Sequence, residues 1–476
     1  MVRTKIVATI GPASSAPETL EAMIRAGMDV ARINLSHGDL SEHLDVIARV
    51  RAASEATGRV VAVLADLPGP KPRTRDLGAM GIELADDERW TLTADDVPAE
   101  RGTLPVDDHG FLAAVNRGDH VVLGDGAVVL VVEDVGATGT VATVRVGGHL
   151  RGRPGIRVIG APRVGVVPTA QDVELLRAML AAQVDFVGVS FVVGADDLRR
   201  VRALLPDDDA RPAPLLVAKI ETAEAVAALD DVLAVSDAVM VARGDLGMNC
   251  PLEDVPLLQK RIIESAVLAA KPVITATQML ESMTTADEPT RAEVSDVANA
   301  VFDGTDAVML SGETAIGVDP VRVVETMRRI ATRADVAAIE AGGGPRATVS
   351  RSNDSLEDRI TDAIGPAACR VAADVGASAI LCWTRAGSTA RAVVRSRPRT
   401  PVVGLSTVDA TLRGLALSWG VEPLRTREAV TDVDAAVRAA SDAGLVAAGD
   451  LVVVVAGIPD TLRVVVVPEV AGRSAR

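Results

Sequence analysis

The stretch AVMVARGDLG, residues 238–247, decides the fold of this chain. Five apolar or small residues lead to Arg243, and Gly-Asp-Leu-Gly follows directly. A β-branched run that ends in glycines and a carboxylate predicts a buried strand whose C-terminal end opens into a tight turn. Backbone N–H groups that point one way in such a turn bind anions, and Asp245 beside them offers an oxygen ligand to a divalent metal. A plain strand-end turn with a solvated Asp245 explains these ten residues equally well.

Strand-like and helix-like segments alternate on both sides of this stretch, in about eight strand-then-helix units. Such alternation implies a parallel sheet, and eight units that close on themselves form a (β/α)8 TIM barrel. Polar residues stand almost entirely at the C-terminal ends of the strands, whereas a doubly wound open sheet, the rival fold, places its ligands at one switch point. We therefore expect the α/β barrel. The expected strands are 5–10, 29–35, 60–67, 186–192, 215–221, 238–246, 272–279 and 307–313. The expected helices are 17–26, 41–56, 169–182, 195–204, 254–269, 290–301 and 320–333.

The expected barrel comprises residues 1–68 and 165–340. Two further regions differ from it in their pattern of strands, helices and glycines. Residues 69–164 carry short β-rich runs with frequent glycine and no long helical period, which predicts a small inserted all-β domain. Residues 342–345, Gly-Gly-Gly-Pro, predict a linker, and 345–476 form another α/β domain. Its expected strands are 379–384, 401–406 and 452–457, with a helix at 387–396. It has no GxGxxG motif, so we do not expect a dinucleotide site there.

The amino-acid composition argues against several classes of function. The chain has 476 residues and a formal net charge of -16, which argues against nucleic acid or an anionic membrane as the main partner. Three cysteines support neither a disulfide framework nor a zinc site. Tyr is absent and Phe and Trp are rare, which argues against binding by aromatic stacking. Neither a signal peptide nor an apolar run of about 18 residues is present, and we expect a soluble, cytoplasmic protein.

Two charges two residues apart mark the strand before the deciding stretch. Lys219 and Glu221 point to the same face of their strand, and buried charges are unfavourable unless they are paired or bind a ligand. Adding Asp245 from the next strand gives two carboxylates that suit Mg²⁺, with Lys219 as a point charge for a transferring phosphoryl group. Gly244 permits close approach of a substrate anion. Thr277 ends another strand, and its hydroxyl either holds a carboxylate and relays a proton or simply bonds the backbone. A buried structural ion pair remains the alternative for Lys219 and Glu221.

Basic and polar residues follow the second and third strands. Arg32 and Asn34 again share one face, and Arg is suited to bidentate phosphate binding. Ser36 and His37 come next, and His37 either contacts a nucleotide or caps a loop. Arg73 is a second phosphate candidate at the start of the insert. These residues would meet the Lys219 group at the C-terminal end of the barrel, where catalysis takes place in this fold.

At these residues the chain resembles the pyruvate kinase family, and the resemblance covers nearly its whole length. The motifs are highly specific as a set. The matching stretches are TKIVATIGPASS (4–15), GMDVARINLSHG (27–38), VAKIE (217–221), VMVARGDLG (239–247), KPVITATQMLESM (271–283) and TRAEVSDVANAVFDGTDAVMLSGETAIG (290–317).

The resemblance implies phosphoryl transfer from phosphoenolpyruvate to ADP, giving pyruvate and ATP in the last step of glycolysis. It also implies that the insert is a small β-barrel lid, that 345–476 is an effector and oligomerisation domain, and that the enzyme is a homotetramer. By analogy the catalytic residues are Lys219, Thr277 and Arg32, and the substrate is held by Arg32, Lys219, Gly244, Asp245 and Thr277. The resemblance places the nucleotide at Asn34, Ser36, His37 and Arg73. It also implies that Glu221 and Asp245 hold Mg²⁺, with Mn²⁺ as an alternative.

A change in one motif predicts that potassium is not required. The family commonly has Leu-Asp-Thr-Lys-Gly-Pro-Glu-Ile-Arg where this chain has ADLPGPKPR (65–73). Pro68 replaces a Lys and Lys71 replaces a Glu. In most family members the Lys, the Glu and the bound potassium ion together carry one positive charge, and here Lys71 alone carries the same charge. The ammonium group of a lysine can occupy the place of a monovalent cation. The alternative is that Lys71 points to solvent at the lid hinge. The family's potassium site corresponds to Asn34, Ser36, Asp66 and Leu67.

Other departures keep alternatives open. Pro154 stands where the lid of the family usually has Lys, with Arg153 and Arg157 as substitutes. The loop TRAGST (384–389) resembles a sugar-phosphate effector loop, but its partner AGIPDT (456–461) is short. A magnesium-dependent barrel enzyme acting on another enol phosphate or 2-oxo acid therefore remains an alternative, as does a non-catalytic regulatory paralogue.

Overall fold

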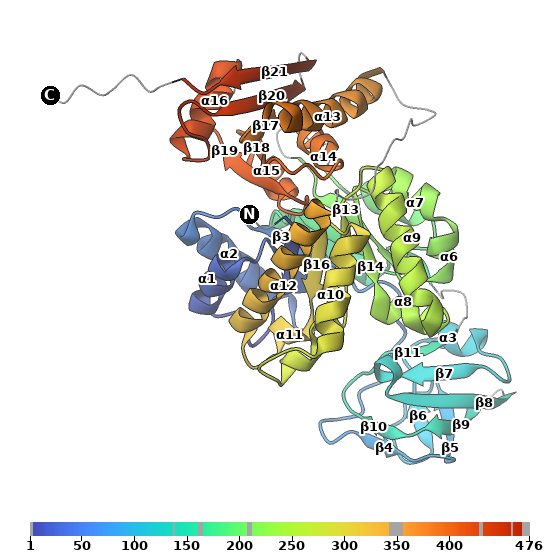
Figure 1. The fold of residues 1–476 in the computed structure, drawn as a ribbon. Coiled ribbons are helices and arrows are strands. Elements are labelled where there is room, and N and C mark those ends of the chain that lie inside the picture. Colours follow the sequence, from blue (N-terminus) through green and yellow to red (C-terminus); the bar gives the residue numbers. More distant parts are fainter. Residues whose placement is uncertain are drawn as a thin grey trace.

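A closed ring of eight parallel strands forms the centre of the computed structural model (Figure 1). The structure describes residues 3–136, 139–159, 165–206, 212–341, 356–427, 432–457 and 460–468. The strands follow one another around the ring in the order β1-β16-β15-β14-β13-β12-β3-β2, so the predicted TIM barrel is confirmed. They are β1 (Lys5–Thr9), β2 (Val30–Asn34), β3 (Ala62–Asp66), β12 (Phe186–Val189), β13 (Leu215–Ile220), β14 (Ala238–Ala242), β15 (Val273–Ala276) and β16 (Ala307–Leu310).

Helices surround this ring, and several begin with a reciprocal cap. At α2 the Asp39 carboxylate accepts from the Glu42 N–H and the Glu42 carboxylate accepts from the Asp39 N–H, which satisfies two N–H groups that the helix leaves unpaired. Thr290 and Glu293 do the same at α10. The helices are α1 (Pro17–Ala26), α2 (Leu40–Thr57), α4 (Ala170–Ala181), α5 (Ala195–Arg202), α6 (Ala223–Ala227), α7 (Leu229–Val235), α8 (Arg243–Asn249), α9 (Val255–Leu268), α10 (Arg291–Asp303), α11 (Gly312–Ala315) and α12 (Pro320–Glu340).

The helix α8 corrects one prediction. The glycines at 244 and 247 predict a tight turn after β14, whereas the chain enters a helix directly at Arg243. The local signal was misread because glycine disfavours helix interiors, but a short helix at a strand end is positioned by its packing against the barrel. The consequence for anion binding is the same, since the first turn of a helix also exposes unpaired N–H groups.

The barrel is packed on both sides of its strands. Side chains that point outward meet the helices in one large apolar core. Those that point inward fill the ring, among them Leu64, Phe186, Met240 and Met309, so the barrel has a solid interior. Leu417 of the C-terminal domain belongs to the same inner cluster and is buried. The C-terminal domain therefore closes one end of the ring.

The insert follows β3 and forms two sheets around a core that includes Trp90. Six strands pair in the order β11-β7-β8-β9-β5-β6, and β10 pairs with β4. Within the residues that the structure describes, these strands do not join into one closed ring. The helix α3 (His109–Ala114) also lies in the insert, so the all-β prediction is wrong in that detail. The strands are β4 (Ile82–Leu84), β5 (Arg89–Thr93), β6 (Thr103–Pro105), β7 (His120–Leu123), β8 (Val128–Gly136), β9 (Gly139–Val146), β10 (Gly148–Leu150) and β11 (Ile156–Val158).

The C-terminal domain is a separate α/β unit with the sheet order β19-β18-β17-β20-β21. Its predicted strands are confirmed by β17, β18 and β20, and the predicted helix by α14; β21 pairs antiparallel with β20. The predicted linker at 342–345 lies outside the described residues. The elements are α13 (Leu356–Val375), β17 (Ala379–Trp383), α14 (Ser388–Val394), β18 (Val402–Ser406), α15 (Asp409–Leu415), β19 (Val421–Arg425), α16 (Val433–Asp442), β20 (Leu451–Gly457) and β21 (Asp460–Val466).

The insert and the C-terminal domain lie at opposite ends of the barrel (Figure 1). The insert leaves from the C-terminal end of β3. The C-terminal domain docks where strands begin, because Lys5 at the start of β1 donates to the Val421 carbonyl oxygen at 2.8 Å. This arrangement leaves the C-terminal ends of the strands facing the insert. Among the helices in the described parts of the chain, we find none that combines the length and the apolar character needed to cross a bilayer.

Candidate active site

Lys219, on β13, is the centre of a buried charge cluster at the C-terminal end of the barrel. Its ammonium nitrogen lies 2.7 Å from Ser190 Oγ, 2.9 Å from Glu221 Oε1 and 3.2 Å from Asp66 Oδ1. Burial by itself would lower the pKa of Lys219, but the carboxylates of Asp66 and Glu221 raise it well above its usual value. The ammonium group is therefore charged at neutral pH and nearly enclosed by the protein.

Arg32, on β2, is fixed by the same cluster. Its Nε and Nη2 atoms donate to Asp66 Oδ2 at 2.8 and 2.6 Å, and Nη1 donates to Thr9 Oγ1 at 2.9 Å. Burial would raise the pKa of Asp66, but Lys219 and Arg32 together hold it below its usual value. Asp66 therefore stays ionised and holds two cations next to each other at the mouth of the barrel.

Glu221 follows β13 and is completely buried. Its Oε2 accepts a hydrogen bond from the Phe191 N–H at 2.7 Å. Its Oε1, like Asp66 Oδ1, has an ammonium neighbour but no hydrogen bond of normal geometry. Burial and the like charge of Asp245 raise the pKa of Glu221, although Lys219 opposes the shift. Glu221 and Asp245 thus lie close enough to interact.

These two carboxylates suit a divalent cation that also binds water and substrate, rather than a metal ion held by protein ligands alone. Glu221 Oε1 faces the Lys219 ammonium at 2.9 Å but accepts no hydrogen bond of normal geometry, and a divalent cation would stabilise it further beside the like charge of Asp245. In the described chain no group of three or more His, Cys, Asp or Glu residues could hold a metal ion. Mg²⁺ needs only one or two protein carboxylates, because waters and substrate oxygens complete its shell.

Gly244 and Thr277 meet where α8 begins. The Gly244 N–H donates to Thr277 Oγ1 at 2.8 Å, and that hydroxyl donates to the Ala276 carbonyl oxygen at 2.6 Å. A β-carbon at position 244 would lie 3.5 Å from Thr277 Oγ1, an ordinary contact, so the protein's own packing does not require glycine there. The first N–H groups of α8 and one hydroxyl thus form a small polar surface next to Asp245.

The predicted potassium and nucleotide residues lie around β2 and β3. Asn34 Oδ1 accepts from the Ser36 N–H at 3.2 Å, and the exposed His37 follows. The Leu67 carbonyl oxygen accepts from Ser190 Oγ at 2.7 Å. Ser190, which directly follows β12, therefore links this segment to Lys219, a role that was not assigned to it from the sequence.

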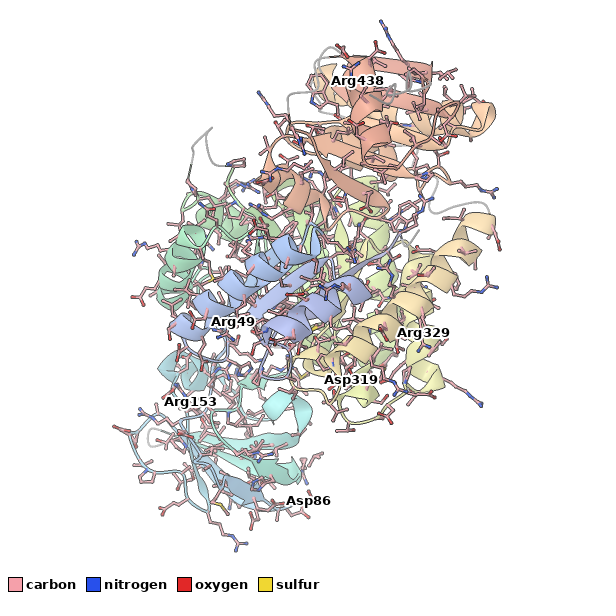
Figure 2. The ribbon with its side chains drawn as sticks, turned by 90° about the vertical axis from the view of Figure 1, so that its left-hand side faces the viewer. Arg49, Asp86, Arg153, Asp319, Arg329 and Arg438 are labelled. Atoms are coloured by element: carbon pink, nitrogen blue, oxygen red, sulfur yellow. The ribbon has the colours of Figure 1, made fainter. Side chains whose placement is uncertain are left out.

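Lys71 lies beside a candidate metal carboxylate, whereas Arg73 lies in the stem of the insert. The Lys71 ammonium nitrogen lies 3.7 Å from Asp245 Oδ1, and the side chain is 25% exposed. The structure therefore brings Lys71 to the candidate metal carboxylate. Arg73 instead donates to the Arg153 carbonyl oxygen at 3.0 Å, in the stem between barrel and insert. Figure 2 shows Arg153 at that junction.

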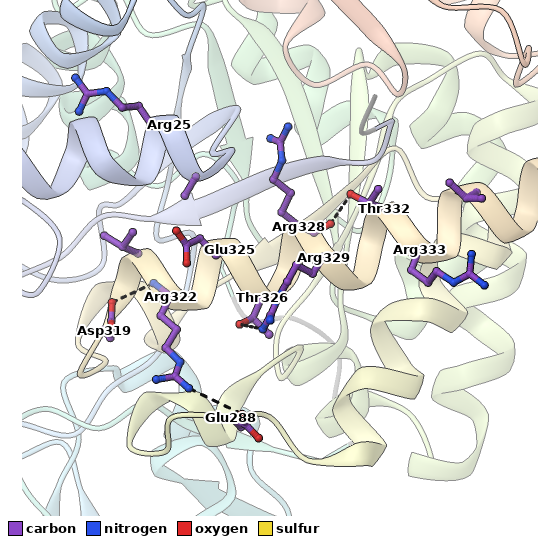
Figure 3. Close-up of a pocket in the computed structure, with 13 residues that line it drawn as sticks. Arg25, Glu288, Asp319, Arg322, Glu325, Thr326, Arg328, Arg329, Thr332 and Arg333 are labelled. Carbon is purple, nitrogen blue, oxygen red and sulfur yellow. Dashed lines mark hydrogen bonds and ion pairs between the residues drawn. The ribbon is translucent and has the colours of Figure 1, made fainter.

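A large hollow elsewhere on the molecule is unrelated to this cluster. It measures about 1070 Å³ and lies along the outer side of α12 (Figure 3). Arg322, Arg328, Arg329 and Arg333 line it together with Arg25 of α1. It contains none of the residues that surround Lys219.

Comparisons with known proteins agree along the whole chain. The family model "Pyruvate kinase, barrel domain" matches residues 1–324, and "Pyruvate kinase, alpha/beta domain" matches 362–465. A pyruvate kinase from Geobacillus stearothermophilus is 42% identical over 465 residues, which covers 96% of this chain and 78% of that protein. One from Thermococcus litoralis is 39% identical, covering 98% of this chain and 99% of the relative. The crystal structure of a pyruvate kinase from Cryptosporidium parvum superposes with a TM-score of 0.86 at 31% identity, covering 98% and 96% of the two chains.

Proposed function

Because the chain belongs to the pyruvate kinase family, we propose that the charge cluster around Lys219 transfers the phosphoryl group between phosphoenolpyruvate and ADP. The chain is a pyruvate kinase, and its family implies these two substrates. The observation that carries the assignment of residues is the Lys219 ammonium group, held by Asp66, Glu221 and Ser190. It supplies a preorganised positive charge in a nearly enclosed site, where such charges stabilise transition states most strongly.

In the first half of the reaction Lys219 neutralises charge on the moving phosphoryl group while ADP attacks in line. Arg32, fixed by Asp66, binds the phosphate oxygens. Glu221 and Asp245 would hold Mg²⁺, with Mn²⁺ as an alternative, and the bound cation would supply charge neutralisation for the phosphoryl oxygens. Glu221 Oε1, which accepts no hydrogen bond of normal geometry and faces the Lys219 ammonium at 2.9 Å, supports this choice.

In the second half the enolate accepts a proton at carbon. Thr277 relays that proton from water, and its hydroxyl already contacts the start of α8. Gly244, Asp245 and Thr277 hold the substrate carboxylate, and on binding it takes the place of Thr277 Oγ1, to which the Gly244 N–H donates at 2.8 Å.

The nucleotide lies along Asn34, Ser36, His37 and Arg73, between the barrel and the insert. The insert, residues 69–164, acts as a lid that excludes water and limits hydrolysis. The barrel comprises 1–68 and 165–340, and 345–476 is the effector and oligomerisation domain. The contact of Arg73 with the Arg153 carbonyl oxygen supports a hinge role for this stem.

The enzyme does not require potassium, because Lys71 supplies the charge. Its ammonium group lies 3.7 Å from Asp245 Oδ1, near the candidate metal carboxylates, which supports a place in the site over one in solvent. The Leu67 carbonyl oxygen, at a position of the family's potassium site, accepts a hydrogen bond from Ser190. Turnover with Mg²⁺ in a buffer whose only monovalent cation is tetramethylammonium tests this. A rise of tenfold or more on adding potassium chloride, about 1.4 kcal/mol of barrier, would refute it.

The enzyme is a cytoplasmic homotetramer. Apolar side chains around α10 to α12 stand in solvent in the single chain: Phe302 is 53% exposed, Ile316 67% and Val318 66%. Ile316 and Val318 lie two residues apart between α11 and α12, and adjoining exposed apolar residues are typical of contacts between subunits. Sedimentation velocity at micromolar concentration should give the mass of four chains, and a monomer at that concentration would exclude the assembly.

The catalytic assignment is tested by coupling pyruvate formation from phosphoenolpyruvate and ADP to a dehydrogenase. Phosphoryl transfer that requires both substrates and a divalent cation is the expected result. Activity with another enol phosphate only would favour the related barrel enzyme, and no activity with any would favour a regulatory paralogue.

A further inference from the structure

Arg243, the first residue of α8, turns its side chain back across the end of β15. Its Nη2 donates to the Thr277 carbonyl oxygen at 2.7 Å, and Nε donates to the Ala276 carbonyl oxygen at 3.3 Å. The other side of the guanidinium meets Asp296 of α10, with Nη1 2.8 Å from Oδ1 and Nη2 2.7 Å from Oδ2. Nη1 also donates to Gln259 Oε1 of α9 at 3.2 Å. One side chain therefore joins the start of α8, the end of β15 and two outer helices.

The backbone that Arg243 holds is strained. Thr277 has φ of 71° and Gln278 has φ of 52°, so two consecutive residues other than glycine occupy the left-handed region. For a β-branched residue such as Thr277 this conformation is an outlier. It persists only where the surroundings determine it, and such positions cluster at functional sites. The guanidinium of Arg243 binds the carbonyl oxygens on either side of the Thr277 α-carbon, which are the groups that must be fixed.

Arg243 also acts on both hydrogen-bond partners of the Thr277 hydroxyl. That hydroxyl donates to the Ala276 carbonyl oxygen at 2.6 Å, the same oxygen that Arg243 Nε binds. Arg243 directly precedes Gly244, whose N–H donates to Thr277 Oγ1 at 2.8 Å. The side chain of Arg243 fixes the Thr277 backbone, and its main chain begins the helix that binds the Thr277 side chain. Because Asp296 anchors the guanidinium, the distance between α8 and Thr277 depends on the Arg243–Asp296 pair.

We propose that Arg243, anchored by Asp296, is a positioning residue that aims the Thr277 hydroxyl at the enolate, an inference that rests on the proposed function. In the step it serves, the enol π electrons form a C–H bond with a proton from Thr277, the enolate oxygen becomes the ketone oxygen, and water restores the hydroxyl proton. A misplaced hydroxyl lets the enolate leave and take its proton in solution, where neither face is preferred.

Lysine cannot replace this arginine. The planar guanidinium presents several donors in a fixed fork, whereas an ammonium group is a single point charge on a flexible stem. Arg243→Lys keeps the charge but loses the simultaneous contacts with Ala276, Thr277 and Asp296. The matched control is Arg199→Lys on α5, where Arg199 forms an exposed ion pair with Asp196 at 2.7 Å.

The experiment measures which face of the enolate is protonated. Phosphoenolpyruvate carrying one deuterium at a defined C3 position is turned over in tritiated water, and the chirality of the pyruvate methyl group is determined. Wild type and Arg199→Lys should protonate one face. In Arg243→Lys the ratio of the two faces should fall at least tenfold. Asp296→Asn, which keeps an acceptor for the guanidinium, should give an intermediate ratio and serves as the second variant if Arg243→Lys does not fold.

Wild-type facial selectivity in a folded variant at either position, whatever its turnover, would overturn the inference and assign the pair a purely structural role. A wild-type protein that does not phosphorylate ADP would instead overturn the proposed function. The two failures are therefore distinguishable, because the coupled assay on the wild type precedes the stereochemical one.

Discussion

The two ends of the barrel treat buried carboxylates in opposite ways. At the end that meets the C-terminal domain, Asp335 of α12 accepts four hydrogen bonds: from the Arg3 and Thr4 N–H groups, from Thr4 Oγ1 and from Trp419 Nε1, at 2.8 to 3.1 Å. At the other end, the buried Glu221 Oε1 and Asp66 Oδ1 accept no hydrogen bond of normal geometry and face the Lys219 ammonium at 2.9 and 3.2 Å. Four hydrogen bonds fix the Asp335 carboxylate in a domain contact, whereas carboxylate oxygens that face one ammonium group keep the capacity to bind a ligand or cation.

The end that meets the C-terminal domain is also cross-linked through Trp419. The guanidinium groups of Arg3 and Arg397 lie 5.3 and 4.6 Å from the Trp419 ring, on the boundary between barrel and C-terminal domain. Arg3 further donates to the Pro398 carbonyl oxygen at 3.0 Å. In this fold one end of the barrel contributes stability and the other contributes chemistry, and substitutions should separate the two.

The largest effect is expected at the catalytic end, from Lys219→Met. Removal of the ammonium group should lower turnover by several orders of magnitude, since a single electrostatic stabiliser is worth about 10²–10³ or more. Lys260→Met, which removes an exposed lysine paired with Asp303, is the matched control and should leave turnover unchanged. The coupled assay measures both, and near-normal turnover in Lys219→Met would remove this residue from the mechanism.

The next largest effect is expected at the opposite end, from Asp335→Ala. Four donors lose their acceptor in a buried position, which should lower the free energy of unfolding by about 3–5 kcal/mol. Asp196→Ala, at a carboxylate that is 79% exposed, should change it by less than about 0.5 kcal/mol. Urea unfolding followed by circular dichroism gives both values. Equal stability of the two variants would show that the end that meets the C-terminal domain does not carry the stability assigned to it.

A smaller effect should appear in acid, at Asp66. Its pKa is lower in the folded protein than in the unfolded chain, where it is about 3.9. Its contribution to stability is therefore fully present above that unfolded value and is lost as the pH falls toward the lower folded one. The gap in unfolding free energy between wild type and Asp66→Asn should be constant near neutral pH and shrink below about pH 4. A gap that widens in acid would contradict the sign of the shift.

The smallest effect is expected far from the catalytic end, at the C-terminal loop that resembles a sugar-phosphate effector loop. Gly457 pairs with Asp460 in the β20–β21 ladder, and residues 458–459 between them lie outside the described residues. Because the strands pair so close to their connection, little chain is present to cover a sugar bisphosphate at 384–389. Fructose 1,6-bisphosphate should activate weakly or not at all. A strong leftward shift of the phosphoenolpyruvate saturation curve would show otherwise.

Much of the catalytic end was predictable from the sequence, because its residues follow strands at a regular position. Lys219 and Glu221 share a face by the period of a strand, and the polar ends of parallel strands meet at one edge. The contact of Lys219 with Asp66 was not predicted, since the predicted strand order separates β13 from β3 by β12 and says nothing about side chains that reach across the intervening strand.

The contacts at the other end were beyond sequence reasoning. Asp335 receives hydrogen bonds from residues near the start of the chain and from Trp419, and no local pattern relates such distant positions. Asp335 lies in a helix and could equally have faced solvent. The helix α8 was missed for a similar reason, because packing overrode the glycine signal.

The pairing of β1 with β16 has a consequence for biosynthesis. Lys5 pairs with Ala307, so the ring stays open until nearly two thirds of the polypeptide has left the ribosome. Within the described part of the chain, the strands of the insert pair with one another and not with the barrel, and they emerge well before that point. Domains fold as units during synthesis, and pairings between distant segments form slowly. The insert should therefore already be folded on the nascent chain before β16 has been synthesised and can pair with β1.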